Sequence, residues 1–172
     1  MKGKSREDTD KRHALLAVMG TLPAMAQQTM KEQLIGSWSV TSLKATSEGQ
    51  VSYPLGEKLA GYVTMTPTRM WLLFVDSTRK PPAGPNLSEA EAAAMMKTQV
   101  AWTGKYSVGE QTPEGLKITA HVDAASSQAI AGMDRVYFVR VEGNKIIFKS
   151  PGVVVPMTGK MSVVEFEMTK AD

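Results

Sequence analysis

Three side chains suited to proton transfer or charge stabilisation, His121, Asp123 and Arg135, lie on or beside two successive strand-like segments of this sequence. A histidine side chain titrates near neutrality, so His121 could shuttle a proton beside Asp123, and Arg135 could stabilise a developing negative charge. An isomerase or cyclase without a cofactor could use such a set in a pocket that holds the substrate's reactive conformation. The chain has no Gly-x-Ser-x-Gly, phosphate loop or dinucleotide fingerprint, so we predict no cofactor.

The direction of His121 is left open by its neighbours. Polar residues at positions 117, 119, 121 and 123 alternate with apolar residues at 116, 118, 120 and 122. Alternation of this kind points the imidazole away from the apolar face and toward solvent. A single β-bulge, or a cavity with a polar lining, would reverse that orientation.

Aromatic side chains with polar atoms are candidates for ligand contact. Trp102 and Tyr106 fall on one side of a predicted strand, and Tyr62 and Tyr137 lie on two others. Rings of this type suit a pocket that buries an apolar ligand and orients it through a few hydrogen bonds. The same residues would also suit an amphipathic outer surface or an ordinary core.

Short strand-like runs separated by turn signals dominate the chain after a short helical turn at residues 28–34. Eight are predicted, over residues 38–43, 61–66, 70–75, 100–108, 116–122, 135–141, 145–149 and 161–168. A proline-rich segment at residues 79–85 and a capping box that opens at Ser88 predict one inserted helix that extends to about Gln99.

Eight antiparallel strands joined in up-and-down order favour an all-β closed barrel, because closure removes the two exposed sheet edges. A barrel of this size is just wide enough to be filled by side chains or to hold one small ligand. The barrel domain is expected to span residues 27–172.

Residues 1–26 have the pattern of a signal peptide. A charged stretch ends at Arg12, an apolar run follows from Ala14 to Leu22, and Ala24 and Ala26 provide small residues for cleavage before Gln27. We therefore expect a periplasmic or secreted protein, and a cytoplasmic protein with an N-terminal tail is the alternative. The apolar run is far shorter than the roughly 20 residues that cross a bilayer, so no integral membrane segment is predicted.

Composition narrows the chemistry further. A chain of 172 residues without cysteine is expected to form one domain and excludes disulfides, zinc–cysteine sites, iron–sulfur clusters and thiol nucleophiles. Two histidines make an all-histidine metal site implausible. Residues 1–26 carry five cations and three anions, which leaves 15 basic and 14 acidic residues in the remainder. That balance predicts no nucleic-acid partner.

The motifs resemble those of the lipocalin-like domain family of bacteria and fungi. The matching segments are Gly36-Ser37-Trp38, Tyr53-Pro54-Leu55-Gly56, Gly61-Tyr62-Val63-Thr64-Met65-Thr66-Pro67, Ala101-Trp102-Thr103-Gly104-Lys105-Tyr106, His121-Val122-Asp123 and Asp134-Arg135-Val136-Tyr137. Met65, Thr68 and Arg69 depart from the family pattern, so the turn near residue 67 is expected to be built differently. The resemblance implies a barrel with a cavity, closed at one end by Trp38 beneath a late-strand cation, for which Lys170 is the candidate.

Our main expectation is an exported protein that holds a small, mostly apolar molecule in its barrel, with Tyr62, Trp102, Tyr106 and Tyr137 as ligand contacts. The alternative is the cofactor-free isomerase or cyclase described above, with His121, Asp123 and Arg135 as its catalytic groups. A barrel filled solid with side chains would support neither.

Overall fold

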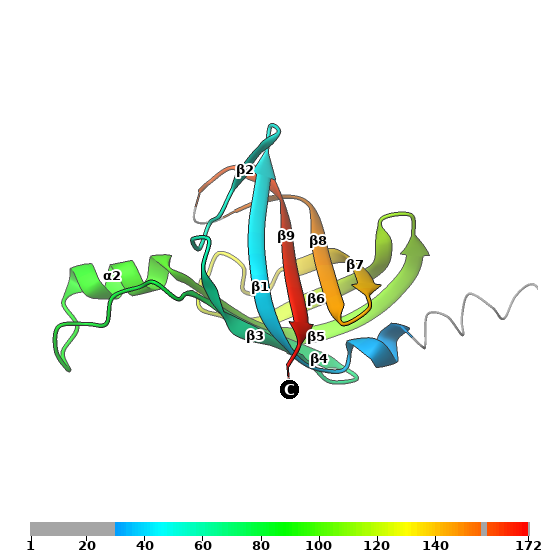
Figure 1. Ribbon diagram of the computed structural model, residues 1–172, viewed down its shortest axis with the longest axis horizontal. Coiled ribbons are helices and arrows are strands. Elements are labelled where there is room, and N and C mark those ends of the chain that lie inside the picture. Colours follow the sequence, from blue (N-terminus) through cyan, green and yellow to red (C-terminus); the bar gives the residue numbers. More distant parts are fainter. Residues whose placement is uncertain (1–29, 156–157, 172) are drawn as a thin grey trace, which may run out of the picture.

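A computed structural model describes residues 30–155 and 158–171 (Figure 1). The signal peptide predicted at residues 1–26 lies outside the described residues. A short helical turn over residues 30–34 precedes the sheet. The elements that follow are β1 (Gly36–Ser47), β2 (Gln50–Ser52), β3 (Leu59–Met65), β4 (Arg69–Asp76), α2 (Glu89–Lys97), β5 (Gln99–Thr112), β6 (Gly115–Ala125), β7 (Asp134–Glu142), β8 (Lys145–Val154) and β9 (Met161–Lys170).

The sheet closes into a barrel because β1 pairs with β9 as well as with β3. All of the strand pairings are antiparallel. The paired strands follow one another in the sequence, except that β1 pairs with β3 beyond β2 and with β9 at the closure. The predicted eight-stranded up-and-down barrel with one inserted helix is confirmed (Figure 1). Thr46 pairs with β2 and Trp38 pairs with β3 while both also pair with β9, so the short extra strand β2 shares one edge of β1 with β3.

Buried and exposed side chains alternate along the strands of the barrel wall, as β6 shows. In β6, Leu116, Ile118, Ala120 and Val122 are all fully buried, whereas the residues between them are partly or fully exposed. This is the period-two pattern expected of a strand with one face on a core and one in water. The inward residues of each strand therefore fill or line the barrel interior.

A tight corner follows β2, where Pro54 fixes the chain direction. The amide of Gly56 donates to the carbonyl of Tyr53 at 3.0 Å, and Gly56 has a φ of 82°, which favours glycine. Leu55 is carried inward by this corner and is 2% exposed. The predicted rigid corner at Tyr53–Gly56 is confirmed.

The inserted helix α2 belongs to an arm that projects from the barrel (Figure 1). None of its residues is buried, and the arm is organised instead by the carboxylate of Glu91. That carboxylate accepts hydrogen bonds from the amide of Ala83 at 2.9 Å and from the amide and hydroxyl of Ser88 at 2.9 and 2.7 Å. Among the described residues, no helix is both long enough and apolar enough to cross a membrane.

Acidification is expected to loosen this arm before it unfolds the barrel. The three hydrogen bonds, led by the one from Ala83, lower the pKa of Glu91 from 4.5 to about 2. Because the folded pKa lies below the unfolded one, the stabilisation is complete above pH 4.5 and is lost as the pH falls toward 2. Amide NMR shifts of Ala83 and Ser88 should follow this transition, while those of the buried Leu116 and Ile118 in β6 stay constant.

Glu91→Gln is expected to reproduce the acid form of the arm at neutral pH, and Glu89→Gln serves as the control because it lies in the same helical turn. Unchanged Ala83 and Ser88 shifts in Glu91→Gln would contradict the assigned role of the carboxylate.

Candidate ligand-binding site

A cavity of about 320 Å³ lies inside the end of the barrel where β4 leads into the arm and β5 begins. Ten of its sixteen lining residues are apolar, four are uncharged polar residues and two are cations. The lining consists of Leu43, Leu72, Phe74, Met96, Lys97, Gln99, Val100, Trp102, Ser126, Ser127, Ile130, Arg135, Tyr137, Val155, Val164 and Phe166. The barrel is therefore hollow at this end.

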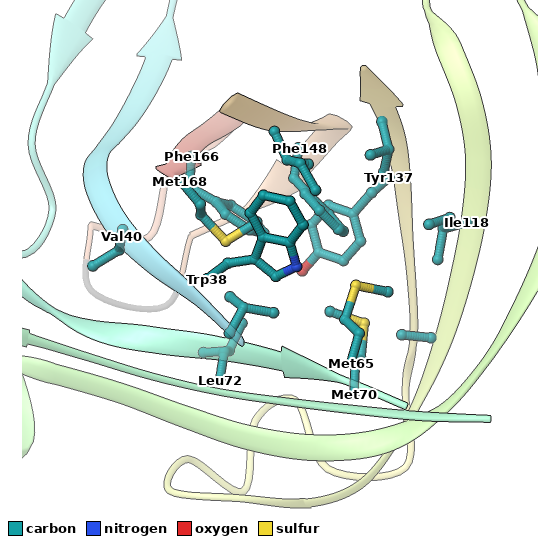
Figure 2. Close-up of a cluster of buried hydrophobic side chains, with 14 of the residues drawn as sticks. Trp38, Val40, Met65, Met70, Leu72, Ile118, Tyr137, Phe148, Phe166 and Met168 are labelled. Atoms are coloured by element: carbon teal, nitrogen blue, oxygen red, sulfur yellow. The ribbon is translucent and has the colours of Figure 1, made fainter. Parts of the chain in front are cut away.

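The other half of the barrel is filled by a cluster of large apolar side chains (Figure 2). Phe166 stacks on Phe148 with ring centroids 4.9 Å apart and meets Phe74 and Tyr137 edge-on at 5.5 and 5.6 Å. Phe74, Tyr137 and Phe166 also line the cavity, whereas Phe148 does not. These three rings consequently form the floor that separates the hollow half from the filled half.

Trp38 lies in the filled half, near the closed end of the barrel, where its indole lies among the clustered side chains in Figure 2. Its ring nitrogen donates to the carbonyl of Leu34 at 2.9 Å, and the ammonium of Lys170 lies 4.4 Å from its ring centroid. Lys170 also donates to Ile35 at 3.0 Å. The expected cation above Trp38 is confirmed. Gly36 has a φ of 126°, which favours glycine, and a Cβ there would also lie 2.6 Å from the Lys170 nitrogen and displace it.

Two of the four predicted ligand contacts, Trp102 and Tyr137, line the cavity, and so does Arg135. Arg135 and Tyr137 alternate on β7 and therefore share its inward face. Burial raises the pKa of the Tyr137 phenol, and the nearby guanidinium of Arg135 partly opposes that rise. A phenol that stays protonated in the cavity can donate a hydrogen bond to a ligand.

Tyr106 and Tyr62 lie elsewhere. Tyr106 is buried near the opposite end, where its hydroxyl donates to the carbonyl of Thr66 at 2.7 Å and fastens the β3–β4 turn. Burial raises its pKa as well. Tyr62 is 57% exposed on the outer face, where it pairs with Leu73 of β4. The structure therefore does not bring the four aromatic residues together in one pocket.

His121 and Asp123 lie on the outside of the barrel wall. The Nδ1 atom of His121 is 2.8 Å from a carboxylate oxygen of Asp134, which is its partner across β6 and β7. Asp123 pairs with Arg69 of β4. Both side chains thus face away from Arg135, and the solvent orientation that the alternation of residues 116–123 indicated is the one observed.

Several lining residues were not anticipated from the sequence. Phe166 and Val164 had a signal, because they alternate with charged residues of β9. The loop after β6 had none: the amide of Ser126 donates to Ala101 at 2.8 Å and prolongs the sheet, and Ile130 is then buried against the core. Lys97 reaches the cavity because α2 returns the chain to β5.

Comparison with known proteins identifies the family to which this barrel belongs. The sequence profile of the lipocalin-like domain family matches residues 35–170, which covers nearly all of the described chain. The chain belongs to the lipocalin-like domain family. Searches of curated protein sequences and of solved structures returned no significant match. Family and fold together support a ligand-binding function for this lipocalin-like protein.

The described lining of the cavity in the lipocalin-like protein is mainly apolar. Among the lining residues that the structure describes, the titratable side chains are Lys97, Arg135 and Tyr137, without an imidazole or a carboxylate. Within residues 30–155 and 158–171, no three histidine, aspartate or glutamate side chains gather in a group that could hold a metal ion. What the arrangement offers is apolar surface with a few hydrogen-bond donors at one side.

Proposed function

We propose that this lipocalin-like protein is exported and holds one small, mostly apolar molecule in the hollow half of its barrel. The observation that carries the proposal is the cavity itself, whose wall is mainly apolar and whose floor consists of the rings of Phe74, Tyr137 and Phe166. Burying apolar ligand surface against such a wall contributes roughly 25 cal/mol per Å².

The size of the cavity limits the ligand. A volume of about 320 Å³ is near the lower end of small-molecule pockets, which span roughly 300–1,000 Å³. It corresponds to the liquid volume of about ten water molecules. A medium-length aliphatic chain or a single substituted ring system would therefore fit better than a long-chain lipid.

Filling the cavity from its wall is expected to weaken this binding. Val164 points inward from β9 and lines the cavity, so Val164→Phe places a ring in the ligand's volume. If two methylene groups of ligand are excluded, affinity should fall about tenfold or more, at about 0.8 kcal/mol for each group. Titration of the protein with N-phenyl-1-naphthylamine, an uncharged probe that fluoresces in apolar surroundings, measures the change.

Val163→Phe is the matched control because Val163 is adjacent on β9 and does not line the cavity. It should bind the probe as the unmodified protein does. Equal affinities of the two variants would place the bound probe outside the cavity and contradict the proposal.

Export has its own test. The support for it is the signal-peptide pattern of residues 1–26, which ends in small residues before Gln27. Mass spectrometry of protein from the periplasm or the medium should show a mature chain that begins at Gln27. An intact N-terminus on protein confined to the cytoplasm would contradict export.

A further inference from the structure

In the described part of the cavity lining, the charged side chains are all of one sign. Arg135 and Lys97 are the two charged residues among the sixteen that line it, and both are cations. Arg135 is only partly exposed, at the first inward position of β7, two residues before the buried Tyr137. Lys97 lies on the last turn of α2, at the rim. The polar side of the cavity is consequently positive.

The guanidinium of Arg135 has no carboxylate partner within the described residues. The two acidic side chains nearest to it along β6 and β7 are already engaged on the outer face, Asp134 with His121 and Asp123 with Arg69. Its neighbour across β6 is the fully buried Ala120, and the β8 pairing with β7 begins only at Phe138. A partly buried cation without a counter-charge is costly unless something else supplies one.

We propose that the ligand is a monocarboxylate with an apolar tail, whose carboxylate pairs with Arg135 and whose tail extends toward Trp102 and Phe166. This inference rests on the proposed function and assigns the ligand's chemical class. Arginine is suited to this role because its planar fork binds both oxygens of a carboxylate, and charge-assisted hydrogen bonds of this kind are stronger than neutral ones. Lys97 adds a second positive charge at the rim, where solvent screens it more.

The phenol of Tyr137 completes the polar side. The ring of Tyr137 lies in the floor of the cavity, and Tyr137 shares the inward face of β7 with Arg135. The two side chains can therefore bind one carboxylate group beside the apolar floor. The positive charge of Arg135 already acts on that phenol.

Three ligands with the same chain and different head groups test the inference on the unmodified protein. Isothermal titration calorimetry with decanoate, decanol and decylammonium should give at least about tenfold tighter binding of decanoate than of decanol, with decylammonium the weakest. Similar binding of decanoate and decanol would overturn the inference and leave the proposed function intact. Failure of all three to bind would contradict the proposed function, and the inference with it.

Substitutions then assign the charge to its residue. Arg135→Gln should remove the preference for decanoate over decanol, and Arg135→Lys should retain part of it. Arg140→Gln is the matched control, because Arg140 lies on the same strand, on the outer face, beside Glu142. Near-ultraviolet circular dichroism checks that each variant is folded. If Arg135→Gln does not fold, the head-group series on the unmodified protein still tests the inference. An unchanged preference in folded Arg135→Gln would overturn the assignment.

Discussion

Phe166→Ala is expected to lower the free energy of unfolding by about 3–5 kcal/mol, because the removed ring is almost fully buried and contacts three other aromatic rings. The same change should deepen the cavity, since Phe166 is part of the floor between the hollow half and the filled half of the barrel. Each additional methylene group that enters the space contributes about 0.8 kcal/mol. Decanol should therefore gain affinity relative to octanol in this variant. Urea unfolding and calorimetry measure the two effects.

Phe138→Ala is the control for this experiment. Phe138 lies on the outer face of β7 between Lys117 and Lys149 and is only partly buried. Its truncation should cost about 1 kcal/mol or less and leave the octanol-to-decanol ratio unchanged. Loss of stability in Phe166→Ala without any gain for the longer alcohol would mean that the ring does not limit the depth of the ligand site.

The barrel could be predicted because its strands obey simple alternation. The apolar set in β6 is the buried set in the structure, and the turn at Glu48 and Gly49 has the positive φ angles of a tight hairpin. The strand β2 was missed because three residues carry no measurable period. Its consequence is the interrupted pairing of β1 along one edge.

The site was harder to predict, because an aromatic or titratable residue type does not determine which face of a strand its side chain occupies. In β3 the inward residues are Val63 and Met65, so Tyr62, directly before Val63, has to face outward despite its aromatic ring. His121 faces solvent, as the local alternation indicates, although the enzyme alternative required it as a catalytic group in the cavity. Tyr106 does point inward, but β5 is long enough to place it near the other end from Trp102.

The loop after β6 and the arm that contains α2 contribute lining residues that the periodicity of the strands cannot predict. Ile130 and Lys97 reach the cavity through chain segments that fold back on the barrel, one after β6 and the other before β5. Their contribution depends on where the chain returns in space, and no local pattern of residue types encodes that path. Sequence therefore specified the wall of the cavity well and its rim poorly.

Trp38→Ala should cost about 3–5 kcal/mol of unfolding free energy, and yet leave ligand affinity unchanged. The indole is 4% exposed, donates to Leu34 and lies beneath the ammonium of Lys170, so all three interactions disappear together. None of them borders the cavity, which is lined at the opposite end of the barrel. Chemical unfolding gives the stability, and titration with N-phenyl-1-naphthylamine at a temperature where the variant remains folded gives the affinity.

Trp71→Ala is the matched control, because Trp71 is 43% exposed on the outer face of β4 and its removal should cost about 1 kcal/mol or less. Trp38→Phe refines the comparison, since it keeps an apolar ring and loses the hydrogen bond to Leu34, which is worth about 1 kcal/mol. A large fall in affinity in folded Trp38→Ala would show that the closed end and the hollow end are coupled. We expect reduced stability with unchanged affinity, because the filled half of the barrel stabilises the fold and the hollow half binds the ligand.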